Sequence, residues 1–193
     1  MEQQSCQELF NRALIVKSLS VNFWGITKRG IRTVMKKHWK SGISFGLTSG
    51  AITTMGLMVG LHSGTHERLA VIGGVFTIAI ADAFSDALGV HIHEESENVH
   101  SSKEIWTVTL ATLISKLIFP LTFIVPLLLF ELKHAIVISI IWGLFLIGFI
   151  SFLLAKNQGV SRKKVIGEHV FIALLVVIMT HYIGGWVNGF FAH

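Results

Sequence analysis

Two aspartates lie inside a stretch of sequence that is otherwise apolar enough to enter a membrane. Asp82 and Asp86 belong to the segment VIGGVFTIAIADAFSDALGVHIHEESE, residues 71–97. A carboxylate at the depth of the hydrocarbon core costs about 2.5 to 3.5 kcal/mol on insertion scales, so a compensating interaction is expected. The chemistry that such a pair can perform is the binding of a cation that crosses the membrane.

On a continuous helix the two aspartates share one face with three later residues. At about 100° per residue, one narrow stripe contains Asp82, Asp86, Gly89, His93 and Glu97. The rise of the helix puts the two aspartates about 6 Å apart along the axis and places His93 about 10 Å beyond Asp86. We therefore predict that the aspartates share one cation and that His93 with Glu97 forms a separate station nearer the water. The alternative is that hydroxyl groups or a lysine satisfy both carboxylates, which then carry no ion.

Imidazole and carboxylate side chains are frequent in the polar segment that follows, residues 91–104. The candidate metal ligands within it are His91, His93, Glu94 and Glu97. The pairs His93 with Glu97 and His91 with Glu95 have i, i+4 spacing, which suits loose capture of a divalent transition metal. The alternative interpretation is a solvated helix end that is charged because it leaves the membrane.

The composition is that of an integral membrane protein. The chain has 193 residues, of which 52% are hydrophobic and 14% charged. Several windows of about 20 residues are almost free of charge, which is the length needed to cross a bilayer. The formal net charge of +5 comes from basic residues beside these windows, a pattern typical of flanks near anionic lipid, so we predict no nucleic-acid partner. A single cysteine, Cys6, excludes an intrachain disulfide and a cysteine-based metal cage within one subunit.

The predicted fold is all-α: an integral membrane bundle of five transmembrane helices with an N-terminal interfacial amphipathic helix. Residues 1–40 mix basic side chains with apolar ones at helical spacing, which predicts a helical arm in the membrane interface; a solvated basic arm is the alternative. The transmembrane domain is predicted over residues 41–193. Its spans are expected at about residues 42–61, 70–90, 105–130, 135–155 and 165–187.

Two spans have features that bear on the aspartates. The first is dense in Gly, Ser and Thr, which let helices approach closely, so it is expected to be buried among the others. The third contains Lys116 and two prolines, Pro120 and Pro126. A lysine at this depth needs an acidic partner, and Asp82 and Asp86 are its candidates.

Basic residues set the predicted orientation. They cluster before the first span and between the fourth and fifth spans, so the positive-inside rule places the N-terminus and the segment after the aspartates in the cytoplasm. No cleavable signal is predicted at the N-terminus. Five spans are too few for a monomeric pore, so we expect a homodimer in the lipid bilayer that encloses the path between its subunits.

Several motifs resemble those of the vacuolar iron transporter family. The first span carries GLTSG at residues 46–50 and LMVGL at 57–61, which look like that family's first-helix motif, and ADAFSDALG at residues 81–89 is similar to its second-helix motif. Pro120 and Pro126 stand where the family carries its third-helix prolines, and residues 148–184 resemble its closing hairpin. The similarity extends over about residues 42–190.

The resemblance implies a five-helix dimer that exports cytosolic Fe²⁺, and often Mn²⁺, against protons along a path lined by the first two helices. Three positions depart from the family's pattern. Ser49 stands where the family usually has an aspartate, Asp86 where it has a methionine, and Asp82 where it has a small residue. The expected site therefore has harder, all-oxygen character that suits Mn²⁺ or Fe²⁺. The extended cytoplasmic metal-binding domain of some members is absent between the second and third spans.

The predicted function is secondary transport of a divalent transition metal, Fe²⁺ or Mn²⁺, out of the cytosol. Asp82 and Asp86 are expected to bind the ion, with Ser49 and Met58 facing the same path and the His/Glu segment supplying it. No motif for covalent catalysis is found, so an enzyme is not expected, and no permanently bound cofactor is predicted. One alternative is a structural or sensory dimer in which Lys116 neutralises the aspartates. Another is a transporter of a different cation or small solute.

Overall fold

A computed structural model describes residues 36–158 and 160–191 of the chain, without the side chains of residues 157 and 158. The amphipathic helix predicted within residues 1–40 lies almost wholly outside the described residues. The described residues from Trp39 onward form one compact unit. The described part of the chain contains helices and short connections and no β-strand.

Five stretches of helix in the described residues are long and apolar enough to cross a membrane. They are Lys36–Thr65, α2 (Arg68–Ser96), α3 (Ser102–Leu121) continued by α4 (Ile124–Leu129), α5 (Leu132–Gln158) and α6 (Arg162–Phe191). The prediction of an all-helical fold with five helices that could cross a membrane is confirmed for the described residues. The helices run past both ends of most predicted spans, because the hydrocarbon core fixes only the apolar length and the backbone remains helical into the polar interface.

The third span, predicted at about residues 105–130, consists of two helices, α3 and α4. It is interrupted at Thr122 and Phe123, between α3 and α4. Pro126 explains the position of the break, because a proline lacks the N–H that would reach the carbonyl four residues earlier and its ring crowds that carbonyl. The carbonyl in question belongs to Thr122, which instead accepts a 3.4 Å bond from the amide of Val125.

The helix Lys36–Thr65 is the most buried of the five spans, as its small residues predicted. Two of its glycines lie so close to α3 that a side chain at either position would collide with it. A Cβ on Gly42 would lie 2.7 Å from the Cβ of Ala111, and one on Gly46 would lie 2.9 Å from the carbonyl oxygen of Thr112. Glycine at these positions therefore allows the close approach of the two helices.

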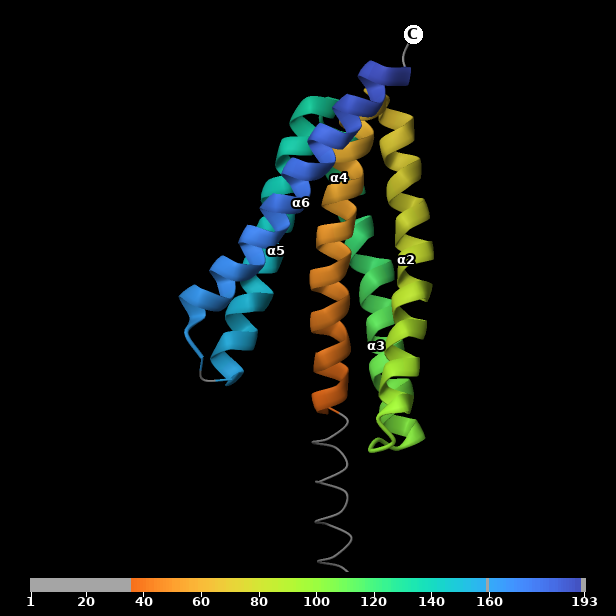
Figure 1. Cartoon of the computed structure of the whole chain (residues 1–193), viewed down its shortest axis with the longest axis vertical. Helices are drawn as coiled ribbons and strands as arrows, with labels where there is room; N and C mark the ends of the chain where they lie inside the picture. Colours follow the sequence, from red (N-terminus) through yellow and green to blue (C-terminus); the bar gives the residue numbers. More distant parts are fainter. Residues whose placement is uncertain (1–35, 159, 192–193) are drawn as a thin grey trace, which may run out of the picture. The chain divides into compact units, whose positions relative to one another are not determined.

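A second row of glycines on the same helix contacts α6. A Cβ on Gly56 would lie 2.9 Å from Val176 Cγ1, and one on Gly60 would lie 3.6 Å from the Cβ of Thr180. The helix Lys36–Thr65 therefore packs on both α3 and α6. Figure 1 shows the two hairpins that it joins, α2 with α3 and α5 with α6.

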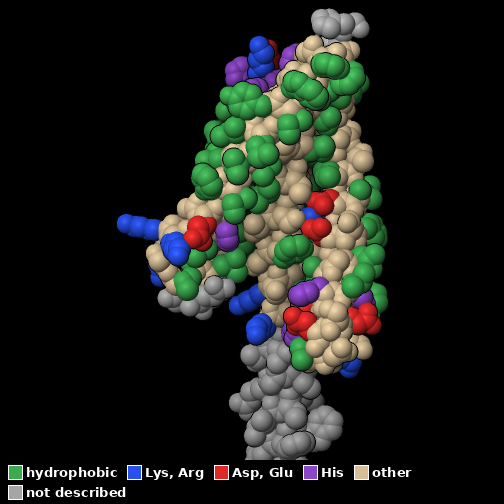
Figure 2. All heavy atoms as spheres, in the orientation of Figure 1, with side chains coloured by type: hydrophobic (Ala, Val, Ile, Leu, Met, Phe, Trp, Pro, Cys, Tyr) green, Lys and Arg blue, Asp and Glu red, His purple; other side chains and the backbone are tan. Residues whose placement is uncertain are grey.

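Large apolar side chains cover the outside of the bundle. On α2 they recur every four residues and are half exposed or more: Phe76, Ile80, Phe84 and Leu88. Similar side chains cover much of the surface in Figure 2. A face of this kind is expected where a helix contacts lipid tails.

Candidate functional site

Lys116 and the two aspartates form one ion-paired group inside the bundle. The ammonium Nζ of Lys116 lies 2.5 Å from Asp82 Oδ2 and also pairs with Asp86 Oδ2. The side chain of Lys116 has no exposed surface, whereas those of Asp82 and Asp86 are 20% and 24% exposed. Figure 2 shows acidic side chains beside a basic one midway along the bundle. The prediction that Lys116 pairs with these aspartates is confirmed.

Two hydroxyl groups of the helix Lys36–Thr65 complete this group. Ser49 Oγ donates to Asp86 Oδ2 at 3.0 Å, and Thr53 Oγ1 donates to Asp82 Oδ2 at 2.8 Å. Lys116 Nζ in turn donates to Ser49 Oγ at 3.0 Å. Each carboxylate therefore receives the ammonium and one hydroxyl. We call these five residues, Ser49, Thr53, Asp82, Asp86 and Lys116, the aspartate cage.

Helical periodicity explains why the cage closes. Ser49 and Thr53 are four residues apart, as are Asp82 and Asp86, so each helix presents two polar groups one turn apart on one face. At Gly50 this part of the helix lies against α3, where a Cβ would make an ordinary contact of 3.8 Å with Lys116 Cε. These contacts supply the compensation that buried carboxylates require.

A cavity of about 600 Å³ extends from the cage toward the polar end of α2. Asp86 lines it, and so do Gly89, His93 and Glu94 farther along α2. Asp86 and His93 are seven residues apart, or about 10 Å along the helix axis. The cavity therefore links one carboxylate of the cage with the His/Glu segment, in agreement with the predicted stripe.

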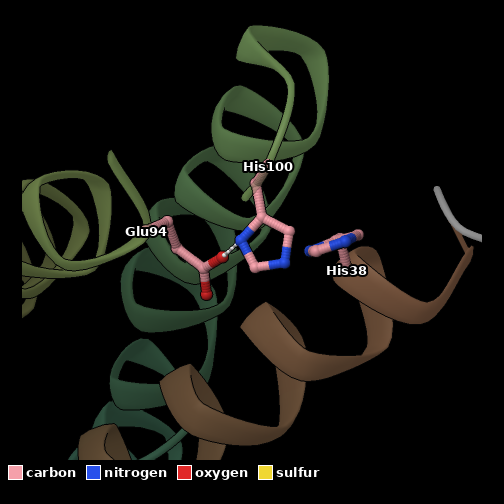
Figure 3. A group of neighbouring side chains, drawn as sticks. All are labelled: His38, Glu94 and His100. Carbon is pink, nitrogen blue, oxygen red and sulfur yellow. Dashed lines mark ion pairs between the residues drawn. The ribbon is translucent and has the colours of Figure 1, made fainter. Parts of the chain in front are cut away.

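Within that segment His93, Glu94 and Glu97 form a linked series of pairs with one another and with His100, whose Nδ1 lies 3.9 Å from Glu97 Oε2. His93 Nε2 lies 3.6 Å from Glu97 Oε1, and both side chains are largely exposed. Glu94 Oε2 lies 2.8 Å from Nδ1 of His100, a residue not among the predicted ligands (Figure 3). The exposed pair of His93 and Glu97 contributes little to stability, whereas Glu94 and His100 are partly buried. These pairs leave carboxylate and imidazole groups beside the cavity.

Two predicted site residues lie elsewhere. His91 is not paired with Glu95, because its Nδ1 is 3.1 Å from Thr109 Oγ1 and its ring packs edge-on against Trp106 of α3. Met58 is 1% exposed in the apolar core. Nine residues separate it from Ser49, a rotation of about 180°, so it lies on the opposite face of its helix.

One member of the cage, Thr53, was not predicted from the sequence. Its position four residues after Ser49 places it on the same face and was a usable signal. The hydroxyl of Thr53 also lies 3.0 Å from the carbonyl oxygen of Ser49. Because one hydroxyl has one proton, the bond to Asp82 competes with a bond along its own helix.

The cage has the donor set of a cation site with a cation already tethered to it. Two carboxylates and one ammonium have a formal charge of −1. The oxygens of Asp82, Asp86, Ser49 and Thr53 are hard ligands, the type that binds Mn²⁺ and comparable divalent ions. No protein-family model, curated protein or solved structure matches the chain.

Proposed function

We propose that the protein is a secondary transporter of a divalent transition metal ion, Fe²⁺ or Mn²⁺, coupled to protons. The observation that carries the proposal is the aspartate cage, which lies inside the bundle at one end of a cavity that extends to a His/Glu segment. Intramembrane carboxylates are rare and usually mark an ion path. The motifs that resemble the vacuolar iron transporter family include Ser49, Asp82 and Asp86, so the resemblance agrees with this assignment.

The chemistry of the cage favours a hard divalent cation. Two carboxylates and two hydroxyls offer only oxygen atoms, and no described cysteine or methionine sulfur is part of the cage. Oxygen sites suit Mn²⁺ and Fe²⁺ better than Cu⁺, which prefers sulfur. If Lys116 releases its proton as a divalent ion takes the place of the ammonium, the formal charge of the cage changes from −1 to zero. Charge neutrality in the apolar core is the physical reason to expect the exchange.

Lys116 then acts as an internal competitor for the metal. Its ammonium holds the position between the carboxylates where a metal ion would bind, and its four-carbon stem gives it freedom to withdraw. When the metal leaves, the ammonium returns and compensates the carboxylates. Transport requires this alternation, since permanent neutralisation would leave an inert site.

We further propose that two copies form the path between them. Small, exposed residues recur every four positions on α2, beside the face that carries the aspartates: Gly73, Thr77, Ala81, Ser85 and Gly89. Rows of small residues let membrane helices associate closely. In this proposal the N-terminus is cytoplasmic, and the membrane is the plasma membrane of a prokaryote or a vacuolar-type membrane of a eukaryote.

The ion pairs of Lys116 also favour a second candidate function. If the ammonium never leaves Asp82 and Asp86, the protein is a structural or sensory membrane dimer without transport. A buried ion pair of this kind specifies which helices pack together, because breaking it leaves an unpaired charge. Movement of metal through the purified protein separates the two functions.

The test is metal flux into proteoliposomes that contain the purified full chain. We expect uptake of Mn²⁺ or Fe²⁺ that falls at least tenfold in Asp82→Asn and in Asp86→Asn, because the variants keep the side-chain volume and lose a ligand charge. Glu168→Gln, which removes an exposed carboxylate on α6, is the matched control and should transport normally. Folded wild-type protein that moves neither metal would favour the structural candidate. A competition series with Co²⁺, Zn²⁺ and Ca²⁺ identifies a different cargo.

A further inference from the structure

A second cavity, of about 540 Å³, lies toward the other end of the helix Lys36–Thr65 from the cavity of the aspartate cage. It is lined by residues of that helix, α5 and α6. His62, on its wall, is thirteen residues from Ser49, or about 20 Å along the helix axis. The proposed transport path does not use this cavity.

One end of the cavity is polar and basic. His62, Lys133 and His181 line it, and Ser63 Oγ lies 2.7 Å from His181 Nδ1, which leaves Nε2 of that ring for another partner. The buried Nδ1 of His62 has no hydrogen-bond partner in the described part of the chain. An unsatisfied buried ring nitrogen needs an explanation.

No carboxylate lines this cavity to balance Lys133. Lys133 is exposed and forms no ion pair with a described residue. The nearest acidic residue in the sequence, Glu131, lies 3.9 Å from His134 instead and is absent from the lining. The end formed by His62, Lys133 and His181 therefore offers hydrogen-bond donors and a positive charge, which suit an anion.

The rest of the cavity is apolar and elongated. Side chains from three helices form its walls: Val59, Ile136, Val137, Ile140, Val177 and Ile178. Lys133 and Ile140 are seven residues apart on α5, so the cavity extends about 10 Å along that helix away from the basic end. Val137, Ile178 and Tyr182 on its rim are exposed, so the cavity opens on the face that contacts lipid.

A metal ion fits this cavity less well than an amphiphile does. At this end of the described bundle no three His, Asp or Glu ligand atoms converge, although structural and catalytic metal sites need about that many. A basic, donor-rich end joined to an apolar slot at a lipid-facing surface matches a molecule with an anionic head and a hydrocarbon tail.

We infer that this cavity binds one acidic phospholipid. Its phosphate accepts hydrogen bonds from Lys133 and from the rings of His62 and His181, and one acyl chain lies between α5 and α6 against Ile136 and Ile140. The bound lipid fills a gap between α5, α6 and the helix Lys36–Thr65 that protein side chains leave open.

Native mass spectrometry of the full chain, purified from vesicles with equal amounts of phosphatidylglycerol and phosphatidylcholine of the same chain length, tests the inference. We expect one tightly retained phosphatidylglycerol. Lys133→Gln should lower its retention about fivefold, the effect of one basic residue on binding of acidic lipid. The matched control, Lys103→Gln, removes an exposed lysine from the first turn of α3 and should leave retention unchanged.

A second variant tests the apolar slot. Val137→Trp fills it from an exposed position and should reduce retention of phosphatidylglycerol while the protein remains folded. Equal retention of both lipids, or the same retention in Lys133→Gln as in the control, would overturn the inference. Stoichiometric binding of Mn²⁺ or Zn²⁺ that depends on His62 and His181, with no lipid retained, would also overturn it and identify a metal site.

Discussion

The ammonium Nζ of Lys116 lies 2.5 Å from Asp82 Oδ2, and the lysine side chain that carries it is completely buried. The same ammonium pairs with Asp86, so one lysine on α3 forms ion pairs with two aspartates on α2. The contact joins two antiparallel helices and accounts for the placement of three ionisable residues in an apolar chain segment. Its energetic and functional consequences can be separated by substitution.

Removal of the ammonium should destabilise the protein and make it responsive to metal. Lys116→Met leaves two carboxylates without their buried partner, and breaking such a pair costs about 3 to 5 kcal/mol. We expect a lower Tm in detergent and a larger rise in Tm on addition of Mn²⁺ than in the wild type, because the metal now compensates both carboxylates. The control is Lys103→Met, at an exposed position. A Lys116→Met protein as stable as the wild type and insensitive to Mn²⁺ would contradict the cage as a cation site.

The hydroxyl of Thr53 should contribute to metal affinity. Thr53→Val removes the donor 2.8 Å from Asp82 Oδ2 with little change in shape. A hydrogen bond to a charged group contributes about 1.5 to 3 kcal/mol, so we expect the affinity of Thr53→Val for metal to fall about tenfold or more. Titration of Mn²⁺ against the stability of the purified protein measures it. Thr53→Ser retains the hydroxyl and should behave as the wild type; equal loss in both variants would show that the methyl group, not the hydroxyl, matters.

The cavity beside Asp86 should be the route to the cage. Gly89 lines it, and a Cβ at this position would meet no atom within 4 Å, so a larger side chain can enter the cavity without distorting the bundle. Gly89→Phe is expected to lower Mn²⁺ uptake into proteoliposomes at least tenfold with little change in Tm. Because Gly89 also belongs to the row of small residues proposed to join two copies, the size of the purified variant must show that the dimer is retained. Gly148→Phe, on α5, has equally open space around its Cβ and is the matched control. Normal uptake by Gly89→Phe would place the route elsewhere.

The close approach of the helix Lys36–Thr65 to α3 should depend on Gly46. A Cβ at Gly46 would collide with the side chain of Ser115 and lie 2.9 Å from the Thr112 carbonyl oxygen. Overpacking of this kind costs about 1 to 3 kcal/mol, so Gly46→Ala should lower the Tm. Gly185→Ala, where the space is open, should leave it unchanged or raise it slightly through better helix propensity. Equal Tm values for both variants would contradict the packing described for these helices.

The sequence alone determined the class of fold and the depth of the charged residues. Crossing a bilayer requires about 20 apolar residues in succession. Each such stretch can be recognised in the sequence by itself, so five spans could be counted without any knowledge of how the helices pack. The expected pairing of Lys116 with Asp82 and Asp86 followed from the same one-dimensional argument. At comparable depths in an apolar medium, opposite charges have few other partners.

Only the tertiary structure decided which faces meet. Met58 and Thr53 were equally available on the first span, but the glycine contacts with α3 and α6 fix the rotation of that helix, so Thr53 joins the cage and Met58 enters the core. His91 likewise contacts Thr109 of α3 and does not pair with the other His and Glu side chains of its segment. The cavity of His62, Lys133 and His181 joins residues up to 119 positions apart, a relationship that hydropathy cannot encode. Helix rotation depends on side-chain packing between segments, and that information is absent from any one segment.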